Sequence, residues 1–246
     1  MTKHMLTSAV FAGFVAGLLA ALLQFAFLEK PILLAEKYES RELVHFQGVA
    51  VAAVTDMSMP AKPAPDAAAP TSQLQTGAGE TSPVMRYLLS VLFAALIYTS
   101  YGLVMVAGFA LANQFGRRVA LQQGLLWGLA GFAAFQMVPA LGMAPELPGI
   151  LAAPLGARQF WWAASAVATV AGLGLLGYGR GLVPWAAALV LLVLPHVIGA
   201  PELDGYSGIV PPELAASFAA RSLGVGLIAW VTLGGLLAWF WNREPV

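Results

Sequence analysis

A motif that carries residues able to bind a metal ion occurs twice in the sequence. Its two copies lie 56 residues apart and read VPALGMAPEL from Val138 to Leu147 and LPHVIGAPEL from Leu194 to Leu203. Carboxylates and a neutral imidazole together suit borderline divalent metals. Glu146, Glu202 and His196 are therefore predicted metal ligands.

Each part of this motif also has a simpler interpretation. A glutamate after a proline suits the first turn of a helix, so Glu146 and Glu202 are equally consistent with the starts of two short surface helices. A histidine near a membrane surface is often an ordinary interfacial residue. However, Pro195 disturbs the helix beside His196, which would turn the imidazole toward an irregular, partly hydrated pocket. The sequence leaves both interpretations open.

Further candidate ligands lie near the ends of the first and third apolar stretches. Gln24 and Gln136 are polar side chains close to the membrane interior, and they suit either a binding site or hydrogen bonds between helices. Glu29 and Glu36 follow the first stretch and are additional predicted metal ligands. Lys37 and other nearby cations favour a different interpretation of this segment, as a solvated helix with salt bridges.

Several classes of function are disfavoured by what the sequence lacks. The chain has no cysteine, which excludes disulfides, thiolate metal sites and cysteine nucleophiles. It contains no Walker motif, no His-Glu-x-x-His and no Gly-x-Ser-x-Gly. Its formal net charge is zero, and no basic run could follow a phosphate backbone. We therefore predict neither an enzyme nor a nucleic-acid-binding protein.

The elements that must position these residues are membrane helices. Of the 246 residues, 59% are hydrophobic and only 10% are charged, and the mean hydropathy is +0.79. A soluble domain typically has about 25% charged residues. The sequence therefore predicts an all-α integral membrane protein that sits in the lipid bilayer, with residues 1–246 forming a single membrane domain.

Six apolar stretches approach or reach the roughly 20 residues that a helix needs to cross a membrane. The first is expected to be a retained helix, because its apolar core is too long for a signal peptide. Only Gly179-Arg180-Gly181 separates the fourth from the fifth. These two form either a tight hairpin or one broken helix. The hairpin gives a bundle of six transmembrane helices, and the broken helix gives a bundle of five. The stretches run from Met5 to Leu28, Tyr87 to Leu111, Val119 to Leu141, Phe160 to Tyr178, Leu182 to Ile198 and Ser217 to Trp241.

Positive charges in short loops predict the orientation, because such loops stay in the cytoplasm. With the N-terminus inside, the short outer loops carry only Arg158 and Arg221. We therefore predict an N-in, C-in protein, which places a long first outer loop and both copies of the motif on the outer face. The basic residues on the cytoplasmic side are then Lys3, Arg117, Arg118, Arg180 and Arg243.

Three further segments have a distinct character. Residues 29–54 mix apolar and charged residues in a helical pattern, which predicts an amphipathic segment on the membrane surface. Residues 55–83 are rich in proline and alanine and are predicted to form a flexible outer loop. The repeat predicts that residues 119–246 are a duplicated helical hairpin. Within the apolar stretches, closely spaced glycines predict close helix packing. Most of the tryptophans there are expected at the membrane interface, namely Trp161, Trp162, Trp230, Trp239 and Trp241.

Four motifs, in the same order, resemble the CbtA family and cover nearly the whole chain. They are LQFAFLEKPILLAEKYE from Leu23, VPALG followed by PELPG from Val138, GARQFWW from Gly156 and LPHVIGAP from Leu194. The resemblance implies a cobalt transporter subunit with about five or six helices in the bacterial cytoplasmic membrane. It also implies a small single-span partner, CbtB, and divalent cobalt as the transported substrate.

The chain departs from this family in one respect. Many relatives carry a histidine-rich stretch in the first outer loop, whereas residues 55–83 contain no histidine. The leading hypothesis is a metal-permease subunit with a metal site on its outer face. The alternative is an accessory or structural subunit of a larger membrane complex, without transport activity. The predicted metal ligands are His196, Glu202, Glu146, Glu29, Glu36 and Gln24.

Overall fold

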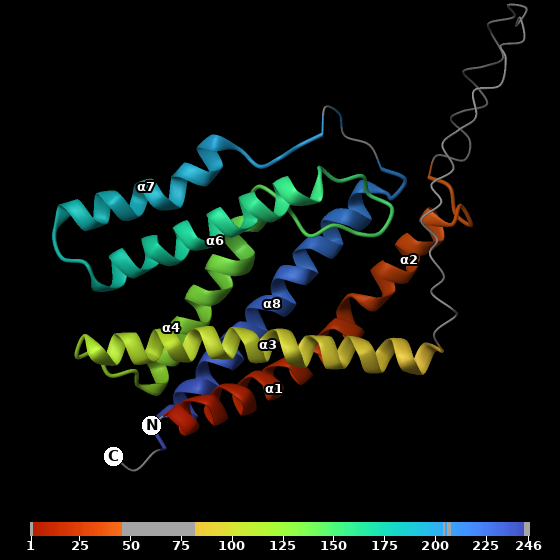
Figure 1. The fold of residues 1–246 in the computed structure, drawn as a ribbon. Helices are drawn as coiled ribbons and strands as arrows, with labels where there is room; N and C mark the ends of the chain where they lie inside the picture. The colour runs from red at the N-terminus through yellow and green to blue at the C-terminus, as the bar shows by residue number, and fades with distance from the viewer. Residues whose placement is uncertain (1, 46–81, 204, 206–207, 244–246) are drawn as a thin grey trace, which may run out of the picture.

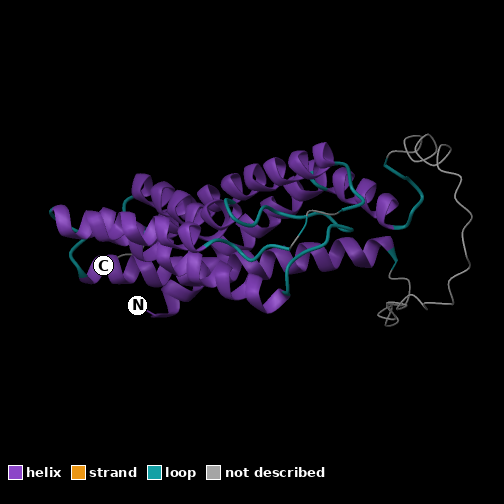
Figure 2. Ribbon diagram, turned by 90° about the horizontal axis from the view of Figure 1, so that it is seen from above, coloured by secondary structure: helices purple, strands orange, loops and turns teal. Residues whose placement is uncertain are grey.

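A computed structural model describes residues 2–45, 82–203, 205 and 208–243. In these ranges the chain forms helices and loops, and the single exception is an isolated β-bridge (Figure 2). Nearly all of the predicted flexible loop, residues 55–83, lies outside the described residues. The same is true of the end of the predicted interfacial segment 29–54.

The helices of the described part follow one another along the chain as shown in Figure 1. They are α1 (Thr2–Phe27), α2 (Glu29–Glu39), α3 (Pro83–Gln114), α4 (Leu121–Phe132), the π-helix η1 (Ala133–Met137), α5 (Val138–Ala140), α6 (Leu155–Tyr178), α7 (Leu182–Ile198) and α8 (Pro212–Trp241).

Four of these helices, α1, α3, α6 and α8, are each long and apolar enough to cross a membrane. The third apolar stretch is also helical, because α4, η1 and α5 continue without a break from Leu121 to Ala140. The fifth stretch is α7, an apolar helix of 17 residues. The predicted all-helical fold is therefore confirmed, whereas the count of six spans is not.

The fourth and fifth stretches are two helices and not one broken helix. α6 ends at Tyr178, α7 begins at Leu182, and the two helices pack side by side (Figure 1). Gly181 has a φ angle of +94° in the turn between them, a conformation that residues with a side chain rarely adopt. Of the two interpretations that the sequence left open here, the hairpin is correct and the broken helix is wrong.

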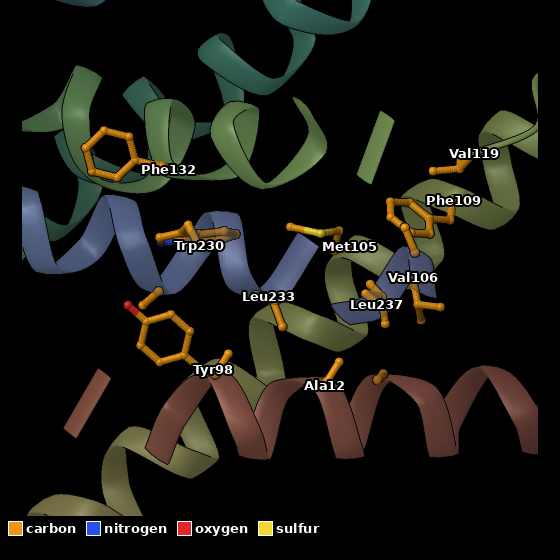
Figure 3. Packing of buried hydrophobic residues seen from close by; sticks show 14 of the residues in the cluster. Ala12, Tyr98, Met105, Val106, Phe109, Val119, Phe132, Trp230, Leu233 and Leu237 are labelled. Carbon is orange, nitrogen blue, oxygen red and sulfur yellow. The ribbon is translucent and has the colours of Figure 1, made fainter. Parts of the chain in front are cut away.

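Helices α1, α3, α4 and α8 enclose the main hydrophobic core. α8 is central, since it contacts the other three and supplies Trp230, Leu233 and Leu237, which are at most 1% exposed (Figure 3). Phe109 of α3 is buried as completely. Burial of these large side chains orders the four-helix core.

Glycines bring two pairs of helices into backbone contact. A Cβ atom added at Gly13 or Gly17 of α1 would collide with the backbone of α3. An atom added at Gly128 of α4 would collide in the same way with the backbone of α8. Close approach of small residues is a usual basis of helix association in membranes. The predicted role of the glycines in close helix packing does not apply to all of them, because a Cβ at Gly174 would have no neighbour within 4 Å.

A proline accounts for the π-helical turn η1. Pro139 has no N–H that could donate to the carbonyl of Phe135 four residues earlier. Immediately before it, the N–H of Val138 donates to the carbonyl of Ala133, five residues back. A π-turn of this kind shifts the residues around it to a different helix face. It therefore determines the direction in which Gln136 projects.

The first turn of α1 and the last turn of α8 lie at the same end of the molecule (Figure 1). At this end, Nδ2 of Asn242 donates to the carbonyl of Val119 at 2.9 Å. The guanidinium of Arg243 lies 3.5 Å from the ring centroid of Trp239. This common position of the two ends agrees with termini on the same side of a membrane.

Candidate functional site

Segments that are far apart in the sequence meet at the end of the molecule opposite these helix ends. One face of α2 packs against Leu147 of the first motif copy, Val210 after the second copy and Phe218 of α8. Ala35 of α2 is completely buried in this contact. The three loops that the charge pattern places on one side of the membrane therefore do lie together.

A backbone bridge joins the two loops that carry the motif. Ile150 in the first loop pairs in antiparallel fashion with Gly208 in the second. Gly149 has a φ angle of +82°, and a Cβ added there would lie 3.0 Å from Ile209 and 3.5 Å from Glu39 of α2. A glycine at this position allows the two loops and α2 to converge.

His196 lies in the last turn of α7, beside Trp161 of α6. The two rings meet edge to face, with centroids 5.8 Å apart. Nε1 of Trp161 donates to the carbonyl of Pro195 at 3.2 Å, which holds the two helices together at this level. Nε2 of His196 is buried and has no hydrogen-bond partner in the described part of the chain. An imidazole nitrogen that keeps its lone pair free is able to bind a metal ion.

Trp162 makes a similar contact to η1, which directly precedes the first copy of the motif. Its Nε1 donates at 3.2 Å to the carbonyl of Phe135, which Pro139 leaves without its helical donor. Gly142 of the same copy packs against Trp161, since an added Cβ would lie 2.5 Å from that ring. Trp161 thus contacts both copies, and Trp162 connects α6 to η1. Trp161 is 6% exposed and Trp230 is 1% exposed, so the prediction that these two are interfacial anchors is wrong.

The two repeated glutamates have different surroundings. Oε2 of Glu146 lies 2.7 Å from Nη2 of Arg158 in α6, and both side chains are about one-third exposed. Glu202 is exposed and makes no hydrogen bond or ion pair with another described residue. Neither glutamate lies in a helix, so the interpretation of the two Pro-Glu pairs as starts of short surface helices is wrong.

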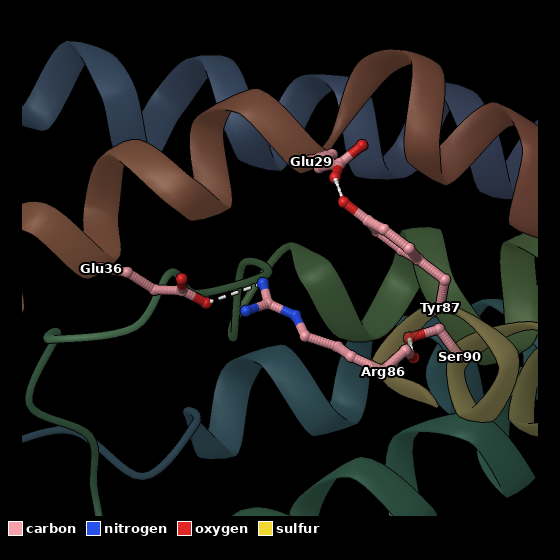
Figure 4. A network of polar contacts seen from close by, with 5 residues as sticks. All are labelled: Glu29, Glu36, Arg86, Tyr87 and Ser90. Carbon is pink, nitrogen blue, oxygen red and sulfur yellow. Dashed lines mark hydrogen bonds and ion pairs between the residues drawn. The ribbon is translucent and has the colours of Figure 1, made fainter. Parts of the chain in front are cut away.

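Glu29 and Glu36 join α2 to the beginning of α3 (Figure 4). The hydroxyl of Tyr87 donates to Oε1 of Glu29 at 2.7 Å. Nη2 of Arg86 donates to Oε1 of Glu36 at 3.1 Å. The two glutamates are seven residues apart, about two helical turns, and therefore share one face of α2. This confirms salt bridging in the segment, with a partner from α3.

The two predicted glutamines occupy different levels of the bundle. Gln24 is half-buried in the last turn of α1, and its backbone carbonyl accepts from the N–H of Leu28 at 2.8 Å. Its side chain makes no hydrogen bond with another described residue. Gln136 projects from η1 against Gly226 of α8, and its Oε1 is buried.

These residues do not form one compact metal site. Within the described ranges, no three histidine, aspartate or glutamate side chains lie close enough together to hold a metal ion. Two of the predicted carboxylate ligands, and Glu42 near α2, instead face cations. The metal-binding role of the six predicted residues stays a prediction. The ion pairs are Glu146–Arg158, Glu36–Arg86 and Glu42–Lys37.

The partners of these residues were not predicted from the sequence. Trp161 and Trp162 looked like interfacial residues, and neither Arg86 nor Tyr87 belongs to the motif. A usable signal does exist, since two glutamates separated by two helical turns face an adjacent arginine and tyrosine at the start of the next helix. That signal becomes specific only when α2 is known to lie against α3.

Comparison with known protein families gives a match over nearly the whole chain. The family described as "Probable cobalt transporter subunit (CbtA)" matches residues 2–242. No curated protein and no solved structure matches the chain.

Proposed function

The chain belongs to the CbtA family, and from this membership we propose that it is a subunit of a system that carries divalent cobalt across the bacterial cytoplasmic membrane. Cobalt is the transported substrate, and the chain catalyses no chemical reaction. The protein crosses the membrane six times, with both termini in the cytoplasm. Other membrane subunits, including a small single-span CbtB protein, complete the system.

The observation that carries the proposal is the meeting of α2 and both motif loops at one end of the molecule. In the N-in, C-in orientation this end faces outward, where cobalt arrives. A first binding site belongs at such an end. Its proposed ligands are the predicted residues Gln24, Glu29, Glu36, Glu146, His196 and Glu202.

The surroundings of these ligands suggest an order of contact. Glu202 is exposed and unpaired within the described residues, so it meets the ion first. His196 then offers a buried Nε2 that has no protein partner there. Glu146 is held by Arg158, so a cation that binds this carboxylate must displace the arginine. Competition of this kind keeps binding weak enough for release, which transport requires.

Accumulation of radioactive cobalt tests the proposal. Cells without cobalt uptake of their own are compared with the same cells expressing this chain, alone and together with the single-span partner. We expect accumulation several-fold above the vector control, with unchanged magnesium accumulation as the control for leakage. Vector-level cobalt in cells whose membranes contain all subunits would refute the proposal.

A second candidate is an accessory subunit that provides no path for the ion. It is favoured by the absence of a three-ligand group in the described ranges and by a core closed by aromatic rings. Purification under native conditions distinguishes the two. The accessory role predicts a stable larger complex whose cobalt uptake continues when this chain is removed, and loss of uptake on removal rejects that role.

A further inference from the structure

Two polar atoms at the centre of the bundle are buried and have no protein hydrogen-bond partner among the described residues. They are Oε1 of Gln136 in η1 and Nε1 of Trp230 in α8. Trp230 is 1% exposed, so bulk water does not reach its N–H. Leaving a buried polar group unpaired is costly in any protein, and especially inside a membrane. A partner for both atoms is therefore expected.

The two residues meet α8 about one helical turn apart. Oε1 of Gln136 rests directly against Gly226, where the absence of a Cβ makes room for it. Trp230 follows Gly226 by four residues, so both face the same side of the helix. Phe135, the neighbour of Gln136, stacks on Trp230 with ring centroids 5.5 Å apart and planes inclined by 9°.

Tyr98 of α3 completes the group. Its ring centroid is 6.4 Å from that of Trp230, and its hydroxyl lies beside the amide of Gln136. In Figure 3 the hydroxyl of Tyr98 and the indole nitrogen of Trp230 point to the same side of the core. Three helical elements thus contribute a donor, an acceptor and a hydroxyl that can be either.

We propose that Gln136, Trp230 and Tyr98 bind one ordered water molecule inside the bundle. An indole N–H can only donate and an amide oxygen can only accept, so a bare cation or anion pairs with one and not with the other. Water accepts from Trp230 and donates to Gln136. The hydroxyl of Tyr98 supplies a third hydrogen bond, and about three is typical of a buried water.

The site lies well inside the membrane. Arg221 of α8 donates to the carbonyl of Phe27 at the end of α1, which lies at the outer end of the bundle in the proposed orientation. Trp230 follows nine residues later, which is about 13 Å deeper along a helix. The water site also has a consequence for transport, which rests on the proposed function. A water at this depth lets a crossing cation keep part of its hydration shell, and the cation then passes between α3, η1 and α8.

Hydroxyl-radical footprinting by X-ray radiolysis tests the bound water, because radicals formed from it oxidise a side chain that bulk solvent does not reach. In the purified full-length protein we expect oxidation of Trp230 and at least a fivefold decrease in Gln136→Leu. Trp239 is 38% exposed and serves as the control, with equal oxidation in both proteins. Absence of Trp230 oxidation in the wild type would overturn the proposal, as would unchanged oxidation in a correctly folded variant.

Tyr98→Phe provides a second reading if the leucine variant fails to fold, because it removes one hydroxyl and little volume. A smaller decrease in Trp230 oxidation, by about twofold, is expected. Oxidation equal to that of the wild type would contradict the assignment of Tyr98 to the site.

Cobalt accumulation separates the proposed route from the proposed function. Uptake by the wild type together with a tenfold lower rate in Gln136→Leu supports a hydrated route through this site. Uptake by the wild type with an unchanged rate in the variant rejects the route. If the wild type takes up no cobalt, the proposed function is rejected. The footprinting experiment then decides on its own whether the water site exists.

Discussion

Single side chains of α6 form hydrogen bonds to both copies of the motif, through Arg158 to Glu146 and through Trp161 to Pro195. Residue type and the repeat were sufficient to select His196 and the two glutamates as candidates. The partners of Glu29 and Glu36 could not be predicted, because the ion pair between Arg86 and Glu36 joins residues 50 positions apart. Such a contact exists only after α2 and α3 have packed.

Replacing Trp161 by phenylalanine keeps an aromatic ring and removes the indole N–H. The carbonyl of Pro195 still accepts a hydrogen bond from the N–H of Gly199 at 3.1 Å, so it is not left unpaired. The variant therefore loses one hydrogen bond and some packing. We expect a destabilisation of about 1–2 kcal/mol, measured by thermal unfolding in detergent. Trp185→Phe is the matched control, because its side chain is 55% exposed. Equal losses in both variants would contradict the role given to Trp161.

The ion pair between Arg86 and Glu36 should contribute little to stability. Its side chains are 49% and 40% exposed, and exposed pairs typically contribute about 0.2–1 kcal/mol. A double-mutant cycle with Arg86→Gln and Glu36→Gln measures the coupling free energy from thermal unfolding at low and high salt. A coupling above about 2 kcal/mol that salt does not reduce would show that the pair is buried in the folded protein.

At the scale of helices, apolar stretches predicted most elements and several of their ends. The fifth predicted stretch, from Leu182 to Ile198, is the observed α7. The π-turn η1 was not predicted. It depends on Pro139, which removes a donor, and also on Trp162, which supplies another from α6. The proline is a local cause, whereas the donor from α6 is present only after the helices have packed.

Glycines that look alike in sequence should differ in their tolerance of alanine. In Gly128→Ala the new methyl group would overlap the backbone of Trp230 and Val231 and push α4 from α8. We expect a loss of about 1–3 kcal/mol in thermal unfolding. Gly174→Ala is the control, because no atom lies within 4 Å of the added carbon, and a gain of up to about 1 kcal/mol is expected. A loss of similar size in both variants would argue against the observed α4–α8 contact.

At the scale of the whole molecule, composition predicted a helical membrane protein, but the arrangement of its helices depends on packing. α4 packs on α8, and α6 packs on α7. In a duplicated hairpin, α4 corresponds to α7 and α6 to α8, so exchanging the two halves also exchanges these two contacts. The duplication within residues 119–246 stays a prediction that this contact pattern favours.

The absence of cysteine allows a direct test of the orientation. Single cysteines replace Leu203, in the second motif loop, and Arg180, between α6 and α7. In intact cells we expect a membrane-impermeant maleimide to label Leu203→Cys, and to label Arg180→Cys only after permeabilisation. Reversed labelling would contradict the N-in, C-in orientation. Labelling of both in intact cells would show that α7 does not cross the membrane.

Cobalt entry at the end formed by α2 and the two motif loops should depend on the ligands proposed there. The measurement is the initial rate of radioactive cobalt uptake in cells expressing the wild type, His196→Ala, or the double variant Glu146→Gln/Glu202→Gln. With equal amounts of protein in the membrane, both variants should be at least tenfold slower, whereas Glu213→Gln, an exposed position in the first turn of α8, keeps the wild-type rate. Wild-type rates in both variants would contradict cobalt entry at this end.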